Sequence, residues 1–210
     1  MSTVTVSPQF AQMVSASQIE EDIIRTLQKW YPTYLAEVAR QLEISPTLLP
    51  QPQNYTNRNS FDAEPGEMIP KVVVIAAGLL EQPVHDAKGN YRAIWRVGVG
   101  IATGAKDEET ANMLAKAYGA ATRAIVLNKT PKEAQNVDLA NIAWIEEAYP
   151  DIPIPQPLML YKAASLFFAL DIQNVVNRWG GPDLPTLQPP PSYGEVQEVF
   201  IDVEQEVVTK

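Results

Sequence analysis

The sequence predicts an α+β domain: a mostly antiparallel sheet packed by one long helix, with an N-terminal helical segment and extended proline-rich loops. Three observations lead to this prediction. Several segments that are β-branched or alternate apolar with polar residues are typical of strands. One long alanine-rich stretch between them has the spacing of an amphipathic helix. A second helical pattern stands near the N-terminus.

The composition limits the chemistry that the chain can perform. It has 210 residues, 46% of them apolar, with no cysteine, one histidine and a formal net charge of −9. A chain of this length can bury a substantial core. Without cysteine there is no disulfide, thiolate metal site, Fe–S cluster or cysteine nucleophile. The negative charge argues against a surface that grips nucleic-acid phosphates.

The apolar pattern does not indicate a membrane protein. The longest apolar run, Val72 to Leu80, is shorter than the roughly 20 residues that span a bilayer. Residues 1–14 lack the basic start of a signal peptide. We therefore expect no membrane partner and favour the cytosol as the compartment.

The first helix is expected to begin at a capping box formed by Ser17 and Glu20, followed by an apolar stripe at helical spacing. Pro32 has no amide hydrogen, so we expect this helix to stop or kink before Thr33. A second helical stretch should then end before Pro46. The following residues are rich in Pro, Gln and Asn and predict a long loop or arm.

The next segments predict a hairpin and a helix. Val72 to Ile75 and Tyr91 to Thr103 are strand-like, and the turn-forming residues 85–90 between them favour an antiparallel pair. Asp107 is a good N-cap for a long helix that continues through Ile125. The alanines of this helix let it lie close against a sheet.

Two more strands are predicted over residues 142–149 and 166–176, and the alternation around Phe200 predicts an edge strand in the same subunit or on a neighbour. We expect a single domain built from the following segments: a flexible N-terminus (1–16), a helical segment (17–44), a Pro-rich loop or arm (45–70), a sheet and helix core (71–178) and a Pro-rich tail with a terminal strand (179–210).

A search for catalytic or metal-binding patterns gives no site. His85 lies in the predicted hairpin loop, and no Gly-x-Ser-x-Gly motif is present. The acidic groups 107–109 and 146–147 have the chemistry to bind a hard cation. The first is better explained by helix capping, and the second by strand residues on opposite faces. We therefore predict no catalytic, metal-binding or cofactor-binding residue and no cofactor.

Residues 98–104 follow a strand and precede a helix, but their Gly-x-Gly-x-x-x-Gly spacing differs from that of a dinucleotide loop. We interpret them as small strand residues that allow close packing by the alanine-rich helix. The aromatic residues Trp30, Tyr31 and Tyr34 are interpreted as core or interface anchors.

Four segments in a particular order carry a resemblance to a known family: residues 91–99, 107–125, 144–149 and 163–170. Together they resemble the tail terminator proteins of long-tailed phages of actinobacterial hosts. The similarity covers about residues 69–176, with a comparable helical N-terminus.

This resemblance implies a small α+β subunit without enzymatic activity that forms a homohexameric ring at the head-proximal end of the tail tube. Such a ring stops tube polymerisation and joins the tail to the head connector or stopper protein. It implies localisation in the neck region of the virion, and in the host cytoplasm during assembly. We expect DNA to pass through an acidic lumen without specific binding.

A subunit of a closed ring presents two different complementary faces, for which long loops and terminal strands are suitable. The residues expected to contact neighbouring subunits or the tube are aromatic side chains in these segments: Tyr55, Phe61, Trp179, Tyr193 and Phe200.

Three alternatives remain open at this point. The chain is another neck or tail component such as a head–tail joining protein, a hydrolase or transferase that uses carboxylates alone, or a monomeric ligand-binding module. A bound metal, or activity lost on changing Glu146 or Glu147, would favour the enzyme.

Overall fold

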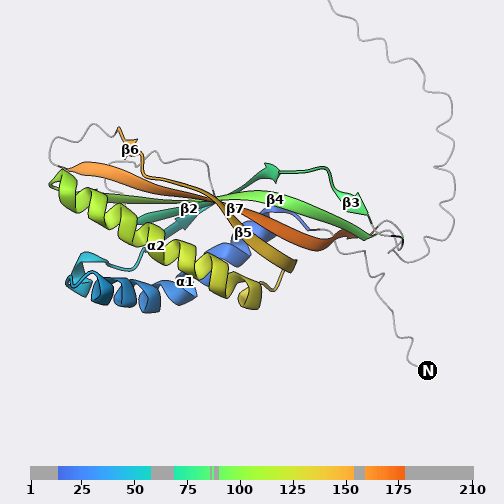
Figure 1. Ribbon diagram of the computed structural model, residues 1–210, viewed down its shortest axis with the longest axis horizontal. Helices are drawn as coiled ribbons and strands as arrows, with labels where there is room; N and C mark the ends of the chain where they lie inside the picture. Colours follow the sequence, from blue (N-terminus) through green and yellow to red (C-terminus); the bar gives the residue numbers. More distant parts are fainter. Residues whose placement is uncertain (1–13, 58–68, 86, 88–89, 154–158, 178–210) are drawn as a thin grey trace, which may run out of the picture. The chain divides into compact units, whose positions relative to one another are not determined.

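The computed structural model describes residues 14–57, 69–85, 87, 90–153 and 159–177, all of which belong to one compact unit, 11–180. Within this unit two helices cover one face of a mixed, mostly antiparallel sheet (Figure 1). The predicted α+β class is therefore confirmed.

The two helices run antiparallel to each other. In the first half of α1 (Ala16–Gln41), Arg25 donates to Gln135, just beyond the end of α2 (Glu108–Glu133), at 2.8 Å. Near the middle of α1, Lys29 pairs with Glu133 at 2.7 Å, and the hydroxyl groups of Tyr31 and Thr122 hydrogen-bond at 2.6 Å inside the core. A 3-10 turn, η1 (Pro46–Leu48), follows α1.

The sheet has the strand order β1-β2-β4-β7-β5, with β3 paired to β4 and β6 paired to β7. Among the strand pairs of the described residues, only β1–β2 is parallel. The strands predicted in the hairpin, after the long helix and before residue 177 are all present, and the N-cap at Asp107 is confirmed. The strands are β1 (Asn54–Thr56), β2 (Lys71–Leu79), β3 (Val84–His85), β4 (Asn90–Ala105), β5 (Asp138–Ala148), β6 (Asp151–Ile152) and β7 (Leu160–Asn177).

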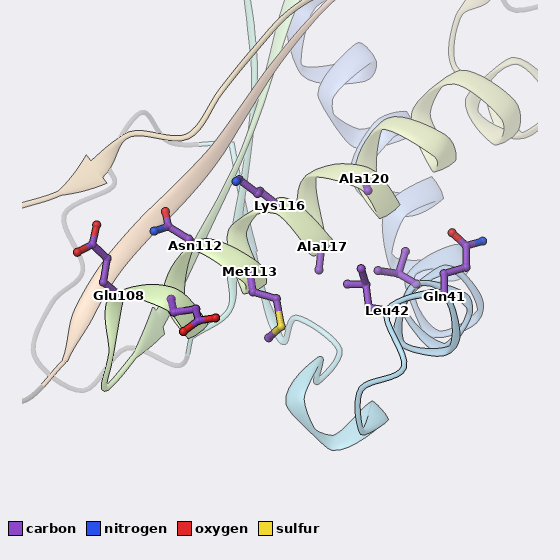
Figure 2. A pocket seen from close by; sticks show the side chains of 10 residues that line it. Gln41, Leu42, Glu108, Asn112, Met113, Lys116, Ala117 and Ala120 are labelled. Atoms are coloured by element: carbon purple, nitrogen blue, oxygen red, sulfur yellow. The ribbon is translucent and has the colours of Figure 1, made fainter.

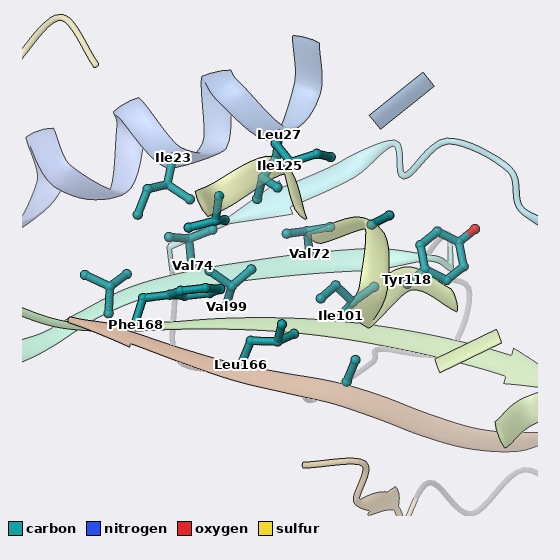
Figure 3. Packing of buried hydrophobic residues seen from close by; sticks show 14 of the residues in the cluster. Ile23, Leu27, Val72, Val74, Val99, Ile101, Tyr118, Ile125, Leu166 and Phe168 are labelled. Atoms are coloured by element: carbon teal, nitrogen blue, oxygen red, sulfur yellow. The ribbon is translucent and has the colours of Figure 1, made fainter. Parts of the chain in front are cut away.

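The core lies between the helices and the sheet. Alternate residues of the three central strands, such as Val74, Val99 and Phe168, face the helices and pack against Leu27 and Ile125 (Figure 3). The period-two pattern that predicted the strands is thus the pattern of their buried side chains.

The prediction that α1 begins with a Ser17–Glu20 capping box was wrong by two residues. Ser15 is the N-cap and forms the capping box with Gln18, whose side chain accepts from the Ser15 amide at 2.8 Å. Glu20 is buried and accepts from the Ala76 amide at 2.9 Å. This carboxylate therefore accepts from a backbone amide of β2 that lies beyond Val73, the last β2 residue that pairs with β1.

The prediction that Pro32 stops or kinks the helix was also wrong, because α1 is one continuous helix with Pro32 inside it. Proline removes the amide that would bind the carbonyl of Gln28. That carbonyl instead accepts from Nε2 of Gln51 at 3.3 Å. Tyr31 and Leu35, on either side of the proline, are both buried, so tertiary packing maintains the helix.

The segment predicted as one long loop, 45–70, contains structure. It includes η1 and the strand β1, which pairs in register with β2 from Asn54 opposite Lys71 to Thr56 opposite Val73. Residues 58–68, like the predicted tail strand near Phe200, lie outside the described residues.

The glycines of 98–104 lie within β4, which confirms that they are strand residues, but they do not face the helix as predicted. Their neighbours Val97 and Val99 point into the helix-covered core, so the glycines face the other side of the sheet. There a Cβ added at Gly98 would come within 3.1 Å of the Phe167 ring, and one at Gly104 within 3.0 Å of Tyr161. These glycines make room for aromatic rings of β7.

A buried carboxylate fastens α1 to the turn between α2 and β5. Asp22 is 1% exposed, and its Oδ2 accepts from the amides of Gln135 and Asn136 at 3.1 and 2.9 Å. Its Oδ1 pairs with Arg25 at 2.8 Å. Because both oxygens of this buried carboxylate have partners, the contact stabilises the turn.

Candidate interaction surfaces

The largest exposed apolar side chains of the described residues include a group at the tip of the β2–β4 hairpin. Leu79, Leu80 and Val84 are 46%, 42% and 67% exposed. We call residues 79–85 the hairpin tip. Isolated exposed apolar residues are ordinary on protein surfaces, whereas a cluster in one short segment marks a candidate contact site.

The hairpin tip is held in place by backbone interactions. The register of β2 shifts between Ala76 and Gly78, and Gly78 has φ +127°, a conformation that side-chain-bearing residues rarely adopt. Beyond this bulge the Leu80 amide donates to the Ile94 carbonyl at 2.8 Å. Bulges of this kind re-aim the side chains that follow them.

His85 belongs to the same tip. The structure places it in β3, exposed, with its ring 5.4 Å from that of Tyr91. There its backbone lies opposite Tyr91 of β4, and this strand pairing helps to close the hairpin.

A second apolar surface is the groove between the C-terminal part of α1 and the first half of α2. It is a hollow of about 770 Å³ (Figure 2). Met113 and Leu42 extend toward the space between the two helices. We call it the α1–α2 groove; its apolar lining is Val38, Leu42, Met113, Ala117 and Ala120, and its polar rim includes Glu108, Glu109 and Lys116.

Farther along the same helix pair lie the three aromatic residues predicted as core or interface anchors. Tyr31 is fully buried, while Trp30 and Tyr34 are half-buried and pack edge to face, with ring centroids 6.4 Å apart. Lys129 of α2 lies 4.0 Å from the centroid of the Trp30 ring. This cation–π contact covers part of the aromatic surface.

A third surface is the strand β5, which carries the half-exposed Trp144 and Ile145. The Arg123 guanidinium stacks 4.6 Å from the Trp144 ring and pairs with Glu147 at 2.5 Å. The Tyr149 hydroxyl donates to the same carboxylate. Burial, and secondarily the Glu147 carboxylate, raises the pKa of Tyr149 to about 12.

The acidic groups considered for cation binding have structural partners. The Asp107 carboxylate accepts from the Thr110 amide at 2.8 Å, and this bond lowers the pKa of Asp107. Glu147 is buried against Arg123, while Glu146 lies on the opposite face and pairs with Arg96 at 3.3 Å. The predicted placement of the two glutamates on opposite faces is confirmed.

Within the described residues, no group of three or more His, Asp or Glu side chains is placed to hold a metal ion. Neither α1 nor α2 contains a long enough stretch of low-charge apolar residues to cross a membrane.

Of the predicted contact residues, only Tyr55 lies in the described part of the chain. It belongs to β1, and its ring centroid is 6.4 Å from that of Tyr31. Burial raises the pKa of Tyr55 to about 12. The ring contact of Tyr55 is thus with a residue of its own subunit. The others, Phe61, Trp179, Tyr193 and Phe200, lie outside the described residues.

Sequence reasoning missed the hairpin tip and the α1–α2 groove. A signal for the tip was present, since the apolar run that begins at Val72 continues to Leu80, past the bulge at Gly78. The groove had no comparable signal, because it depends on which residues of two distant helices face each other.

No protein-family model matches the sequence, and no curated protein matches it. Among solved structures, the chain is similar to a chain of the "Virion of native gene transfer agent (GTA) particle". The two are 16% identical, with a TM-score of 0.42, and the match covers 65% of this chain and 91% of the other.

Proposed function

We propose that this chain is a structural virion protein without enzymatic activity, and that it is the tail terminator of a long-tailed phage. The observation that carries the proposal is the pair of apolar surfaces at separate places on one unit, the hairpin tip and the α1–α2 groove. A subunit of a ring needs two different surfaces of this kind, one for each neighbour.

The arrangement of the charged groups also supports a structural role. The buried carboxylates Glu20, Asp22 and Glu147 bind backbone amides or an arginine, and each of these contacts connects two elements of the fold. These contacts stabilise the fold, and this role accounts for the positions of the three carboxylates.

The particular assembly is inferred from the sequence resemblance to tail terminator proteins described above. On this proposal six copies close a ring on the head-proximal end of the tail tube, stop its polymerisation and join the head connector or stopper protein. The segment around Phe61 and the tail with Trp179, Tyr193 and Phe200 would then be arms that reach neighbouring copies or the tube.

The net charge of −9 fits a channel that DNA traverses. A negative lumen repels phosphates and keeps the passing duplex from sticking. Purified rings are therefore expected to leave duplex DNA unbound at moderate salt in a filter-binding or mobility-shift measurement. Tight, salt-sensitive binding would contradict this part of the proposal.

Electron microscopy of the purified protein, alone and mixed with tail tubes, tests the proposed function. We expect rings that sit on one end of each tube, and tubes that no longer lengthen when tube protein is added. Tubes that keep growing, or that bind the protein along their sides, would contradict a terminator.

A further inference from the structure

We propose that the hairpin tip of one copy docks into the α1–α2 groove of the next copy. The inference rests on the proposed ring and names the contact that would close it. It assigns a partner to two of the apolar surfaces of the described residues that intrasubunit packing leaves uncovered.

The two surfaces lie at opposite ends of one strand. The tip pairs with the first part of β4, His85 opposite Tyr91 and Leu79 opposite Trp95, and β4 ends at Ala105, three residues before α2 begins at Glu108. The stretch from Trp95 to Ala105 spans about 33 Å at the rise of a β-strand. Because this pairing fixes the tip to β4, the tip cannot reach the groove of its own subunit. A contact between them must join two copies head to tail, which is the geometry that generates rings.

The chemistry of the two surfaces matches. The floor of the groove is made of the small residues Ala117 and Ala120, and Met113 contributes a flexible apolar side chain. The hollow of about 770 Å³ falls within the range of pockets that enclose whole ligands, so it has room for several branched side chains. The tip offers Leu79, Leu80 and Val84.

Charge favours the tip over the other candidate occupant, the chain's own C-terminal tail. The groove rim carries Glu108 and Glu109, both exposed. Residues 195–206 include five acidic residues, which would meet this rim with like charge. The tip carries a single acid, Glu81, so it meets the rim, which also holds Lys116, with less like charge than the tail would.

The absence of cysteine from the chain makes the contact directly testable. Two single variants are prepared, Val84→Cys at the tip and Met113→Cys in the groove, and mixed in the presence of a short bismaleimide. Ile145→Cys is the matched control, since Ile145 is a half-exposed apolar residue of β5, outside both surfaces. The oligomeric state of the unmodified protein is measured in parallel by sedimentation velocity.

We expect the Val84→Cys and Met113→Cys mixture to give a covalent dimer, and each variant alone to give at least tenfold less. The Ile145→Cys control should not be linked to either. A variant that carries both cysteines should give a ladder of higher oligomers that stops at the size of the ring.

Other results would overturn the inference. Tip-to-tip dimers from Val84→Cys alone, or equal linkage to Ile145→Cys, would show that the copies meet through other surfaces. If the protein still caps tail tubes in that case, the proposed function stands and only this contact is wrong. If linkage fails and the tubes remain uncapped, both the tip-to-groove contact and the proposed function are wrong.

Discussion

The centre of the sheet and the hairpin tip are built from similar residues but face different surroundings. Leu166 of β7 lies under the helices and is fully buried, whereas Leu80 at the tip is 42% exposed. The core residues are held by partners in their own subunit. The difference indicates that the central apolar residues stabilise the fold, while those at the tip are available to a second molecule.

The largest effect is expected from the same change at these two positions. Leu166→Ala removes a fully buried side chain and should lower the free energy of unfolding by about 3–5 kcal/mol. Leu80→Ala should change it by less than about 0.5 kcal/mol in the isolated subunit. Urea denaturation followed by circular dichroism measures both. Similar losses at the two sites would remove the distinction between core and tip.

Asp22→Asn tests the buried carboxylate that joins α1 to the turn between α2 and β5. The amide keeps the shape of the side chain, but one of its two ends can no longer accept hydrogen bonds, and the charge that pairs with Arg25 is lost. We expect a loss of about 2 kcal/mol, the usual range for buried hydrogen bonds to a charged group. Faster amide hydrogen exchange at Gln135 and Asn136 would locate the effect. Unchanged exchange there would contradict the assigned role.

Gln51→Ala should have a smaller effect, about 1 kcal/mol, because it leaves the Gln28 carbonyl without its side-chain donor. The double-mutant cycle with Pro32→Ala sharpens the test. Alanine restores the amide that bonds this carbonyl in an ordinary helix, so the cost of Gln51→Ala should fall in that background. An equal cost in both backgrounds would show that Gln51 acts elsewhere.

The smallest effect concerns an exposed ion pair on α1. Hydrogen bonds from Arg40, and then from Gln41, lower the pKa of Glu37 from 4.5 to about 2. A carboxyl whose pKa is lowered in the folded state adds stability above its ordinary pKa, and this contribution is lost as the pH falls from about 4.5 to 2. Glu37→Gln should therefore flatten the decline of the melting temperature over that interval. An identical decline in the variant would contradict the role of this pair.

The elements that the sequence predicted correctly are those set by local periodicity. β4, β7 and α2 each alternate or repeat over many residues, and the pattern alone identifies them. Apart from the capping box, which begins two residues earlier at Ser15, the errors arose where a distant partner decides the outcome. α1 passes through Pro32 with its free carbonyl bonded by Gln51 and its neighbours packed in the core, and the Gly98 side of the strand is filled by Phe167 from β7.

The candidate site was less predictable than the fold for the same reason. The exposed end of the apolar run at Leu79 and Leu80 was readable in the sequence, but its exposure depends on where the helices stop covering the sheet. The groove forms because Ala117 and Ala120 happen to face the last turns of α1. Pairing of two helices about 70 residues apart has no local signature.

The most direct test of the central claim, that the hairpin tip joins copies of this chain, is the mass of the assembly with and without an apolar tip. Leu80→Asp combined with Val84→Asp places charges on exposed positions, which the isolated subunit should tolerate. Sedimentation velocity is expected to show a ring for the unmodified protein and a 23.2 kDa monomer for the variant, with the same melting temperature for the variant subunit as for the dissociated unmodified protein. A variant that retains the mass of the unmodified assembly would contradict the claim.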